Sequence, residues 1–333
     1  MQKITPILSY TLILLVSGCW FLGCNPTVLP ASYQAVWLPD SYRYGDLYQM
    51  AFLKDFKEKT VPCAKKYAAA SAKKSIHLYI IGDSFTDQER IDNDDFVSQK
   101  LTRVHWAGKQ QIQLDTTKHN VLILETVERH FREKFVDSVR NFEIASQIPK
   151  IATHEPKAWY KDIETKLEAT LFSSDFFLMF KEWKAALTLH WFGRMHEHVN
   201  IAPDGKNLLY ISDTNPKALT SSFHPFSDQD LKTLVQGVNK TRQYYLKAGF
   251  DEVYLAIIPN KTSIVAPQIA NYNHLIERVQ QHPQLQVPAV DCWQIFRQAN
   301  TPVYLKGDTH WNCTGQTLWL EKVNEALCKI PAN

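Results

Sequence analysis

Three residues near opposite ends of the chain have the types and spacing needed for acyl-transfer chemistry. Ser84 ends the run YIIGDS, in which apolar β-forming residues give way to small and polar ones. Asp308 and His310 stand two positions apart in the segment VYLKGDTHW. A serine hydroxyl becomes a nucleophile when a histidine takes its proton and a carboxylate orients that histidine. We therefore predict a catalytic triad of Ser84, His310 and Asp308.

Ser84 also has a simpler structural explanation. A serine after a strand often serves as a turn residue or a helix N-cap, and Asp83 beside it is typical of a turn. The spacing of Asp308 and His310 favours the catalytic interpretation. In a turn, the carboxylate reaches back to imidazole Nδ1 while Nε2 points outward. A cap at Ser84 would not explain why this Asp-x-His pair occurs at the other end of the chain.

The elements that must position these residues follow an α/β pattern. Three continuous apolar runs predict strands buried on both faces, as in a parallel sheet covered by helices. They occupy residues 75–84, 119–129 and 251–261. Helical patterns occupy residues 125–142, 227–250 and 313–330. We expect a doubly wound, mainly parallel sheet of the α/β class, flanked by helices, with Ser84 past the carboxyl end of one strand, where such sheets bind ligands.

The alternation of strands and helices is lost between residues 145 and 226. This stretch contains helical patterns and a hairpin that turns at Asp204 and Gly205. We interpret it as an insertion that covers the sheet rather than as a separate domain. The main domain then spans residues 75–330, with 27–74 as an N-terminal lead-in.

Residues 1–26 differ in kind from the rest of the chain. One lysine precedes an apolar run, and the sequence VSGC, ending at Cys19, resembles a bacterial lipobox, in which the cysteine is lipidated. An uncleaved anchor and a cleaved secretory signal are the alternatives, because apolar residues continue past Cys19. All three predict an exported, periplasmic or cell-surface protein; lipidation or an anchor would attach it to the membrane through its N-terminus.

The cysteines and the net charge limit which disulfides, metal sites and partners the protein can have. Cys63, Cys292, Cys313 and Cys328 form an even set in an oxidising compartment. We favour a disulfide from Cys313 to Cys292 or Cys328 and leave Cys63 unassigned, because the last expected helix begins and ends at cysteines. The sequence contains no Cys-x-x-Cys pair, so it gives no support for zinc binding. With a net charge of +3 and no basic block, nothing in the sequence indicates a nucleic-acid-binding surface, and no nucleic-acid partner is expected.

At this point the residues carry a family resemblance. The blocks GDSF (82–85) and DTHW (308–311) resemble those of the SGNH hydrolase superfamily. With ETVER (125–129) and IPNK (258–261), the late block is similar to that of the alginate O-acetyltransferase-like branch of periplasmic acyl-transfer proteins. The resemblance spans residues 75–330 and implies Ser84 as nucleophile, His310 as base and Asp308 as its orienting acid. It implies no metal and no organic cofactor. In the alginate enzymes the Asp-x-His block is expected before the serine, whereas here the serine comes first.

The second oxyanion donor has several candidates. Gly108 and Asn120 are available, although neither stands in a recognisable motif. Arg129 would bind an oxyanion or a sugar if it faced the cleft, but an i,i+4 ion pair with Glu125 is the default. Lys261 matches a family position near the active face, and a solvated loop lysine is the alternative.

Other conspicuous residues receive structural interpretations. His196 and His198 lack a third ligand at a suitable spacing, so a metal site is not expected. Trp106, Trp183 and Trp191 would line a carbohydrate cleft or pack in the protein interior.

The sequence as a whole predicts a cell-envelope O-acetyltransferase. It would act on an exported polysaccharide or oligosaccharide and receive acyl groups from a membrane acyl-donor protein. A carbohydrate acetyl esterase of the SGNH type would use the same three residues. A non-enzymatic glycan-binding envelope protein is the third hypothesis.

Overall fold

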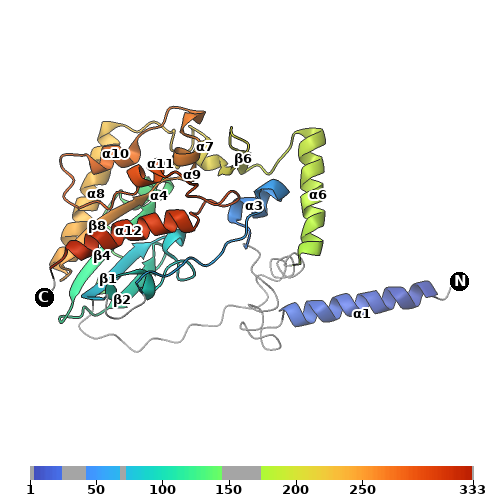
Figure 1. The fold of residues 1–333 in the computed structure, drawn as a ribbon, viewed down its shortest axis with the longest axis horizontal. Helices are drawn as coiled ribbons and strands as arrows, with labels where there is room; N and C mark the ends of the chain where they lie inside the picture. The colour runs from blue at the N-terminus through green and yellow to red at the C-terminus, as the bar shows by residue number, and fades with distance from the viewer. Residues whose placement is uncertain (1–3, 25–42, 68–72, 145–173, 332–333) are drawn as a thin grey trace.

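A four-stranded parallel sheet forms the centre of the molecule (Figure 1). The computed structural model describes residues 4–24, 43–67, 73–144 and 174–331. The sheet consists of β1 (Lys74–Gly82), β2 (Ser98–His105), β4 (His119–Val127) and β8 (Glu252–Ile258), in the spatial order β2-β1-β4-β8. Residues 288–290 extend the edge at β8 through a parallel bridge between Leu255 and Ala289. The predicted α/β fold with a parallel sheet is therefore confirmed.

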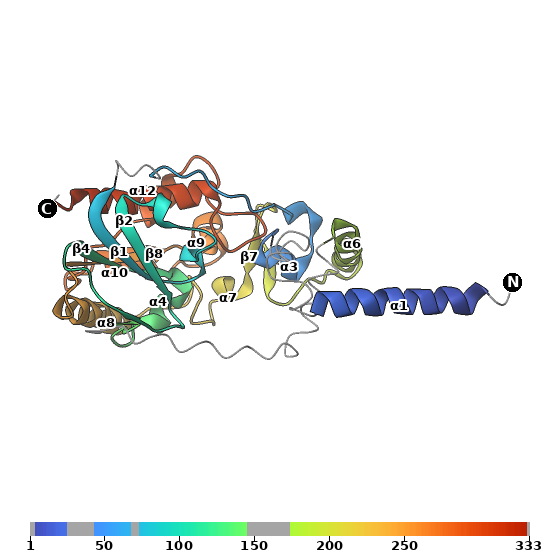
Figure 2. The same ribbon diagram turned by 90° about the horizontal axis from the view of Figure 1, so that it is seen from below.

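Both faces of the sheet are covered, which explains the continuous apolar runs. Successive residues point to opposite faces, so Leu78 and Ile80 join one core while Tyr79 and Ile81 join the other. One face packs against α11 (Trp293–Gln298) and α12 (Cys313–Lys329). The other packs against α4 (Glu128–Lys134), α8 (Asp228–Lys247) and α10 (Leu275–Gln280). Figure 2 shows the resulting three layers, with α12 and α8 on opposite sides of the sheet.

One strand was not predicted, one predicted helix boundary needs correction, and one is confirmed. The edge strand β2 was not predicted, because its side chains are half exposed and polar rather than uniformly apolar. The helix expected over 125–142 is only α4, because β4 continues to Val127. Helix α8 begins as expected at Ser227, which forms a capping box with Asp230. Short strands β3 (Gln110–Ile112) and β5 (Phe142–Ile144) pair in parallel beside the main sheet.

The connections are mostly short helical turns. The 3₁₀ turns are η1 (Lys54–Phe56), η3 (Ser84–Thr86), η4 (Asn93–Asp95) and η6 (Pro267–Ile269). The short helices are α3 (Asp46–Ala51), α7 (Ile211–Thr214) and α9 (Lys261–Val265). Between β1 and β2 the chain forms only η3 and η4, so strand and helix do not alternate there.

The region expected to be an insertion forms a small core of its own. Its residues 145–173 lie outside the described part of the chain. Helix α6 (Asp175–Phe192) and the hairpin of β6 (Val199–Ile201) and β7 (Leu208–Tyr210) pack against α3. The hairpin turns at Gly205, which has a positive φ of 70°, as predicted. Among the described residues of this region, 174–226, Phe223 and Phe226 join the core beneath the sheet.

The N-terminal segment contains α1 (Ile4–Cys24), which includes Cys19. Within the described residues, no helix combines the length and the apolar character that crossing a bilayer requires.

The strand order places a crevice beside the end of β1. The chain leaves β1 towards β2 on one side, and β4 lies on the other. In open α/β sheets this switch in direction opens a crevice at the carboxyl ends of the two strands. Those ends are Gly82 of β1 and Val127 of β4, and Ser84 follows the first of them.

Candidate active site

A tight turn holds Ser84 at the end of β1. Asp83 Oδ1 accepts a hydrogen bond from the Phe85 N–H at 3.0 Å, and its Oδ2 accepts one from the Val127 N–H at 2.9 Å. Asp83 therefore ties the turn to β4, as a turn-stabilising residue would. No hydrogen bond from the Ser84 backbone N–H is found within the described residues. That N–H remains able to donate to a ligand.

Gly82 and Glu125 determine how closely this turn approaches β4. A side chain at Gly82 would place its Cβ 2.1 Å from Thr86 Oγ1 and 2.6 Å from Glu125 Oε2, so only glycine fits. Glu125 Oε2 accepts hydrogen bonds from the Asp83 N–H and the Thr86 hydroxyl. Burial, and then the charge of Asp83, raise the pKa of Glu125 well above its ordinary value. The ion pair expected between Glu125 and Arg129 is absent, because Glu125 still lies on the strand.

The three predicted residues form one hydrogen-bonded chain. Ser84 Oγ lies 2.7 Å from His310 Nε2, and His310 Nδ1 lies 2.6 Å from Asp308 Oδ1. The same carboxylate oxygen accepts the His310 backbone N–H at 2.9 Å. The ring of Phe85 packs 4.7 Å from the imidazole and 5.0 Å from the ring of Trp311. The contact predicted between Ser84 and His310 is present.

The electrostatics of this chain favour an ionised carboxylate at Asp308. Burial by itself would raise the pKa of Asp308, but the hydrogen bonds and charge of His310 outweigh burial and lower it. An ionised Asp308 holds a proton on His310 Nδ1. The lone pair of Nε2 then faces the hydroxyl of Ser84, as a general base requires.

Asp46 is a fourth member of the site that the sequence did not suggest. It comes from α3, and its Oδ1 accepts the Thr309 N–H at 2.8 Å while its Oδ2 accepts the Thr309 hydroxyl at 2.5 Å. Its Oδ2 also lies 3.8 Å from His310 Nδ1. Burial, and then the charge of Asp308, raise the pKa of Asp46. In the sequence, Asp46 has only the pattern of an acidic residue at a helix start.

Gly45 allows this approach. It has a φ of 97°, and a Cβ there would lie 2.4 Å from the Gly307 carbonyl oxygen and 2.8 Å from Asp308 Cβ. The Tyr48 N–H donates to the same Gly307 oxygen at 2.7 Å. The lead-in is therefore in direct contact with the loop that carries the base and its acid.

Metal ligation has one geometric candidate among the described residues. Ligand atoms of Asp46, Asp308 and His310 all lie within 4.8 Å of one another. Their hydrogen bonds to Thr309 and Ser84 already satisfy the atoms concerned. His196 and His198 lie on an exposed turn, with ring centroids 5.4 Å apart, and the described residues supply no third ligand to them.

Ser84 and His310 lie where two surface hollows meet. The first, of about 360 Å³, includes Arg129 and Trp106 in its lining. The second, of about 490 Å³, includes Arg43 in its lining. Asp46 also borders both. A reacting group at Ser84 is therefore accessible from two sides.

Arg129 lies in the first hollow, as the cleft-facing alternative predicted. Its NH1 pairs with Asp213 Oδ2 at 3.4 Å, and only 10% of its side chain is exposed. Its Nε is buried without a hydrogen-bond partner. Burial raises the pKa of Asp213 to about 6, against the opposing charge of Arg129. This guanidinium is the cationic group of the first hollow that lies deepest in the protein.

Two of the other candidate oxyanion donors lie away from Ser84. Asn120 is opposite His77 in the ladder, at the amino end of β4, about 20 Å from Ser84 by strand rise. Its side-chain amide donates to backbone carbonyls of the same loop. Gly108 lies in a turn after β2, where its N–H donates to the His105 carbonyl and its own carbonyl accepts from Asn141. Neither residue lines the two hollows.

Lys261 is neither at the active face nor in solvent. Its Nζ is buried and donates to the carbonyls of Leu305, Lys306 and Asp308 at 2.6, 2.8 and 3.1 Å. Burial lowers the pKa of Lys261 to about 7. Lys261 therefore holds the backbone of the catalytic loop rather than a substrate.

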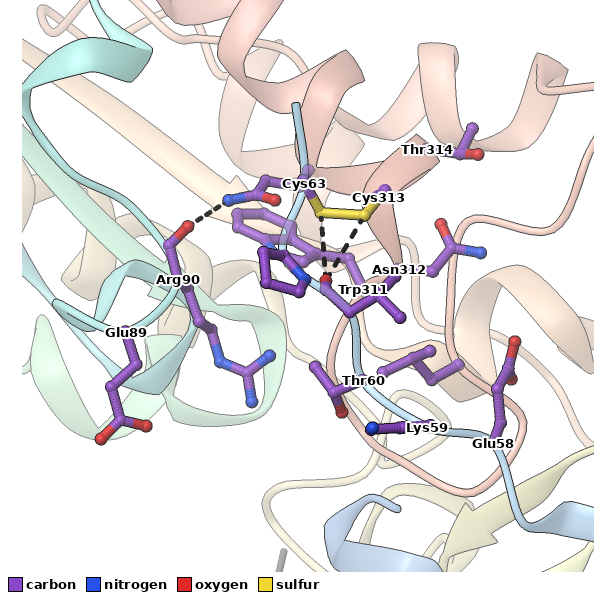
Figure 3. Close-up of a pocket in the computed structure, with 14 residues that line it drawn as sticks. Glu58, Lys59, Thr60, Cys63, Glu89, Arg90, Trp311, Asn312, Cys313 and Thr314 are labelled. Atoms are coloured by element: carbon purple, nitrogen blue, oxygen red, sulfur yellow. Dashed lines mark hydrogen bonds between the residues drawn. A yellow bond between two sulfur atoms is a disulfide. The ribbon is translucent and has the colours of Figure 1, made fainter. Parts of the chain in front are cut away.

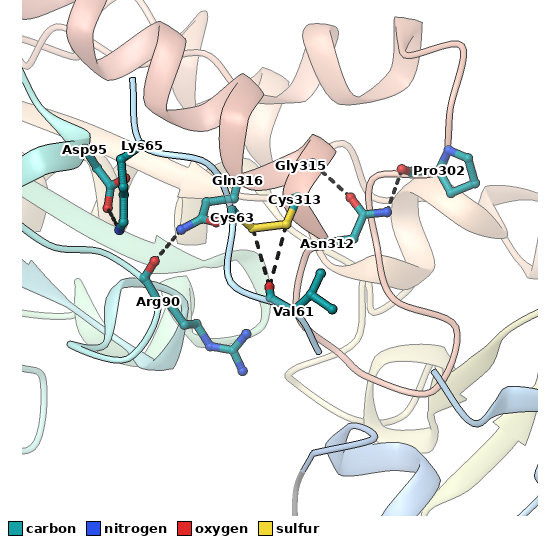
Figure 4. The surroundings of a disulfide bond; sticks show 10 residues. All are labelled: Val61, Cys63, Lys65, Arg90, Asp95, Pro302, Asn312, Cys313, Gly315 and Gln316. Atoms are coloured by element: carbon teal, nitrogen blue, oxygen red, sulfur yellow. Dashed lines mark hydrogen bonds and ion pairs between the residues drawn. A yellow bond between two sulfur atoms is a disulfide. The ribbon is translucent and has the colours of Figure 1, made fainter. Parts of the chain in front are cut away.

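The disulfide joins Cys63 to Cys313, which corrects the predicted pairing (Figure 4). Cys328 lies at the far end of α12 from Cys313, about 20 Å away by helical rise, and Cys292 is buried elsewhere as a free thiol. The bond spans 250 residues and is worth about 5 kcal/mol in the chain-entropy account. It fixes the lead-in to the start of α12, just after His310.

A third hollow, of about 270 Å³, lies beside this disulfide (Figure 3). Glu58, Lys59 and Trp311 contribute to its lining, but Ser84 and His310 do not. It adjoins the second hollow through Thr60 and Arg90, which line both.

A buried carboxyl group behind the site makes stability depend on pH. Glu128 Oε2 accepts hydrogen bonds from the Asn260 N–H and the Ser263 hydroxyl, and burial raises the pKa of Glu128 to about 7. Between about pH 4.3, where an unfolded glutamate titrates, and pH 7 the folded state keeps a proton that the unfolded state loses. Raising the pH through this window should therefore destabilise the fold, by up to about 3 kcal/mol.

We expect Glu128→Gln to remove this pH dependence. The amide oxygen can accept the same two hydrogen bonds, and the amide nitrogen takes the place of Oε1, which has no partner. Urea unfolding between pH 4.5 and pH 8 would measure the free energy of unfolding. Glu133→Gln on the exposed face of α4 is the matched control. Equal slopes for the wild type and Glu128→Gln would contradict the assignment.

Comparison with family models, with curated proteins and with solved structures yields no match for this chain. The interpretation of the site therefore rests on its own residues and geometry.

Proposed function

We propose that this protein is a serine-dependent acyl-transfer enzyme of the cell envelope, an O-acetyltransferase of the SGNH type acting on an exported polysaccharide. The observation that carries the proposal is the continuous chain from Ser84 Oγ through His310 to Asp308. A serine that merely capped a turn would need no imidazole at 2.7 Å. Its position at the carboxyl end of β1, where the strand order opens a crevice, supports the same conclusion.

The chemistry follows in two halves. Ser84 Oγ attacks the carbonyl carbon of an acyl ester while His310 Nε2 takes the hydroxyl proton. The tetrahedral intermediate then expels the donor alkoxide, which receives that proton from Nε2, and the acyl group remains on Ser84. An acceptor hydroxyl attacks the acyl-enzyme, again losing its proton to Nε2. Collapse of the second intermediate releases Ser84, which regains the proton. Asp308 stabilises the imidazolium in both halves.

Two groups would stabilise the oxyanion in this proposal. The backbone N–H of Ser84 has no partner in the described residues, and Arg129 lines the hollow beside it. Preorganised donors of this kind are commonly worth a few kcal/mol each in the transition state. Arg129 would supply a positive charge that the predicted donors Gly108 and Asn120 do not.

Transfer rather than hydrolysis is favoured by the two hollows that meet at Ser84. A donor ester and a sugar hydroxyl can then approach the same serine from different sides. An enzyme that used only water would need one such side. In this proposal the chain is held at the membrane by lipidation at Cys19 and receives acetyl groups from a membrane partner.

A chromogenic acetyl ester tests the proposal. The full chain in detergent would be incubated with the ester, with and without an oligosaccharide acceptor, and the products analysed by mass spectrometry. We expect an acetyl adduct on the peptide that contains Ser84, and acetylated acceptor in the presence of oligosaccharide. Release of acetate alone, unchanged by acceptor, would identify an esterase instead. Binding of oligosaccharide with no acyl movement would overturn the enzymatic proposal.

A further inference from the structure

Helix α6 carries an exposed apolar stripe that faces away from the protein. Every third or fourth residue along one face is large and apolar. The stripe consists of Phe176, Phe180, Trp183, Leu187 and Trp191, with exposed fractions between 49% and 70%. No other element of the described chain covers these side chains. A contiguous apolar face of this kind marks an interaction surface.

The opposite face of the same helix accounts for its attachment to the protein. Leu178 and Glu182 are buried, and Ala185 and Leu189 pack against the small core formed with α3. Glu182 accepts a hydrogen bond from Tyr48 OH at 2.5 Å and pairs with Lys57 at 3.0 Å. The fold therefore fixes α6 through one face and leaves the stripe on the other.

We propose that the stripe docks onto the surface of a lipid bilayer. Phenylalanine, tryptophan and leucine on one face, with basic residues beside them, are typical of helices that lie in the membrane interface. Lys184 on α6 and Arg194 just after it are exposed and able to meet anionic headgroups. The acidic residues Asp175 and Glu182 are both engaged by cations of the lead-in. With both acids of α6 paired in this way, Lys181 and Lys184 give this helix a positive charge.

The position of the N-terminal segment favours a bilayer as the partner that covers the stripe. The apolar helix α1 ends at Cys24, and the described chain resumes at Arg43, whose NH2 contacts Asp175 Oδ1 at the start of α6, 2.8 Å away. The 24 residues from Cys19, the proposed lipidation site, to Arg43 can span at most about 80 Å. If the N-terminus is held at the membrane, as proposed above, α6 is kept within that distance of it. A glycan would favour flat tryptophan or tyrosine platforms, whereas the stripe also contains two phenylalanines and a leucine.

Docking would orient the active site. Arg43 lines the second hollow and also contacts the first residue of α6. With the stripe in the interface, that hollow would lie beside the bilayer, near a membrane-bound acyl donor.

A fluorescence experiment on the full chain tests this docking. An environment-sensitive fluorescent amino acid would replace Leu187, or Lys240 on the exposed side of α8 as the control. Each protein would be reconstituted, one chain per nanodisc, with anionic lipids brominated along the acyl chains. We expect bromine to quench the probe at 187 at least twofold more than the probe at 240. Trp183→Ser together with Trp191→Ser should abolish the difference, whereas Leu219→Ser at an exposed apolar site of another loop should not.

The other outcomes are each decisive. A probe at 187 that stays unquenched with red-shifted emission means that the stripe remains in water, which overturns docking. Blue-shifted emission without quenching means that protein covers the stripe, such as a second copy in more concentrated samples, and also overturns it. Loss of the chain from the nanodisc would overturn the proposed membrane attachment and the docking with it. None of these outcomes depends on acyl-transfer activity, so the two proposals fail separately.

Discussion

Ser84→Ala is expected to lower kcat/KM on acetyl esters by about 10³- to 10⁶-fold, because it removes the proposed nucleophilic oxygen. His310→Ala should cause a loss of similar size, since the Ser84 hydroxyl is a weak nucleophile without the base 2.7 Å away. Residues that act as one unit are not additive. The double variant should therefore retain the same residual rate as either single variant.

Steady-state kinetics with a chromogenic ester would measure these rates, and a fluorophosphonate probe would report the reactive hydroxyl directly. Ser138→Ala, at a serine outside both hollows, is the matched control and should keep wild-type activity. Acidification should also reduce activity, because a protonated His310 cannot accept the serine proton. Wild-type turnover in Ser84→Ala, with probe labelling at another residue, would disprove the assignment of the nucleophile.

Asp308→Asn is expected to lower kcat by about 10²- to 10⁴-fold, less than the loss of the serine or the histidine. The lowered pKa of Asp308 keeps this carboxylate ionised at neutral pH, so that it accepts the proton of His310 Nδ1. An amide can present its NH₂ group instead, which favours the wrong tautomer. Loss of the negative charge also destabilises the imidazolium that forms during the reaction.

The variant Asp46→Asn distinguishes the role of Asp46 from that of Asp308, the other carboxylate beside His310. Asp46 acts through Thr309 and lies 3.8 Å from Nδ1, so we expect a loss of less than about tenfold. Because a nearby carboxylate stabilises the charged imidazole, its removal should move the acid limb of the pH profile to lower pH. A purely structural role would leave that limb unchanged. If Asp46→Asn were as damaging as Asp308→Asn, the roles assigned to the two carboxylates would be wrong.

The sequence by itself determined the features that depend on local pattern. The apolar runs at β1, β4 and β8 predicted buried parallel strands, because burial on both faces removes the polar alternation. Ser227 predicted the start of α8, and the Asp-Gly pair predicted the turn of the β6-β7 hairpin, because caps and turns are set by a few neighbouring residues. The spacing of Asp308 and His310 likewise predicted their hydrogen bond, since one intervening residue suffices to form it.

Contacts between distant segments were decided only by the tertiary structure. Asp46 reaches the catalytic loop from the lead-in because Gly45 permits a close approach to Gly307, and no local pattern encodes that approach. The pairing of Cys63 with Cys313 brings together residues 250 positions apart, whereas proximity in sequence suggested a different partner.

The direction of the strands decided which of the other candidate residues lie near Ser84. Asn120 lies at the amino end of β4, whereas Arg129 follows its carboxyl end, where Ser84 lies. Lys261 follows β8 at that end too, but its side chain turns inward to the carbonyls of the loop that carries Asp308. A residue type indicates which chemistry a side chain can do. Which end of the sheet it reaches, and whether protein groups already occupy its donors, depends on how the whole chain packs.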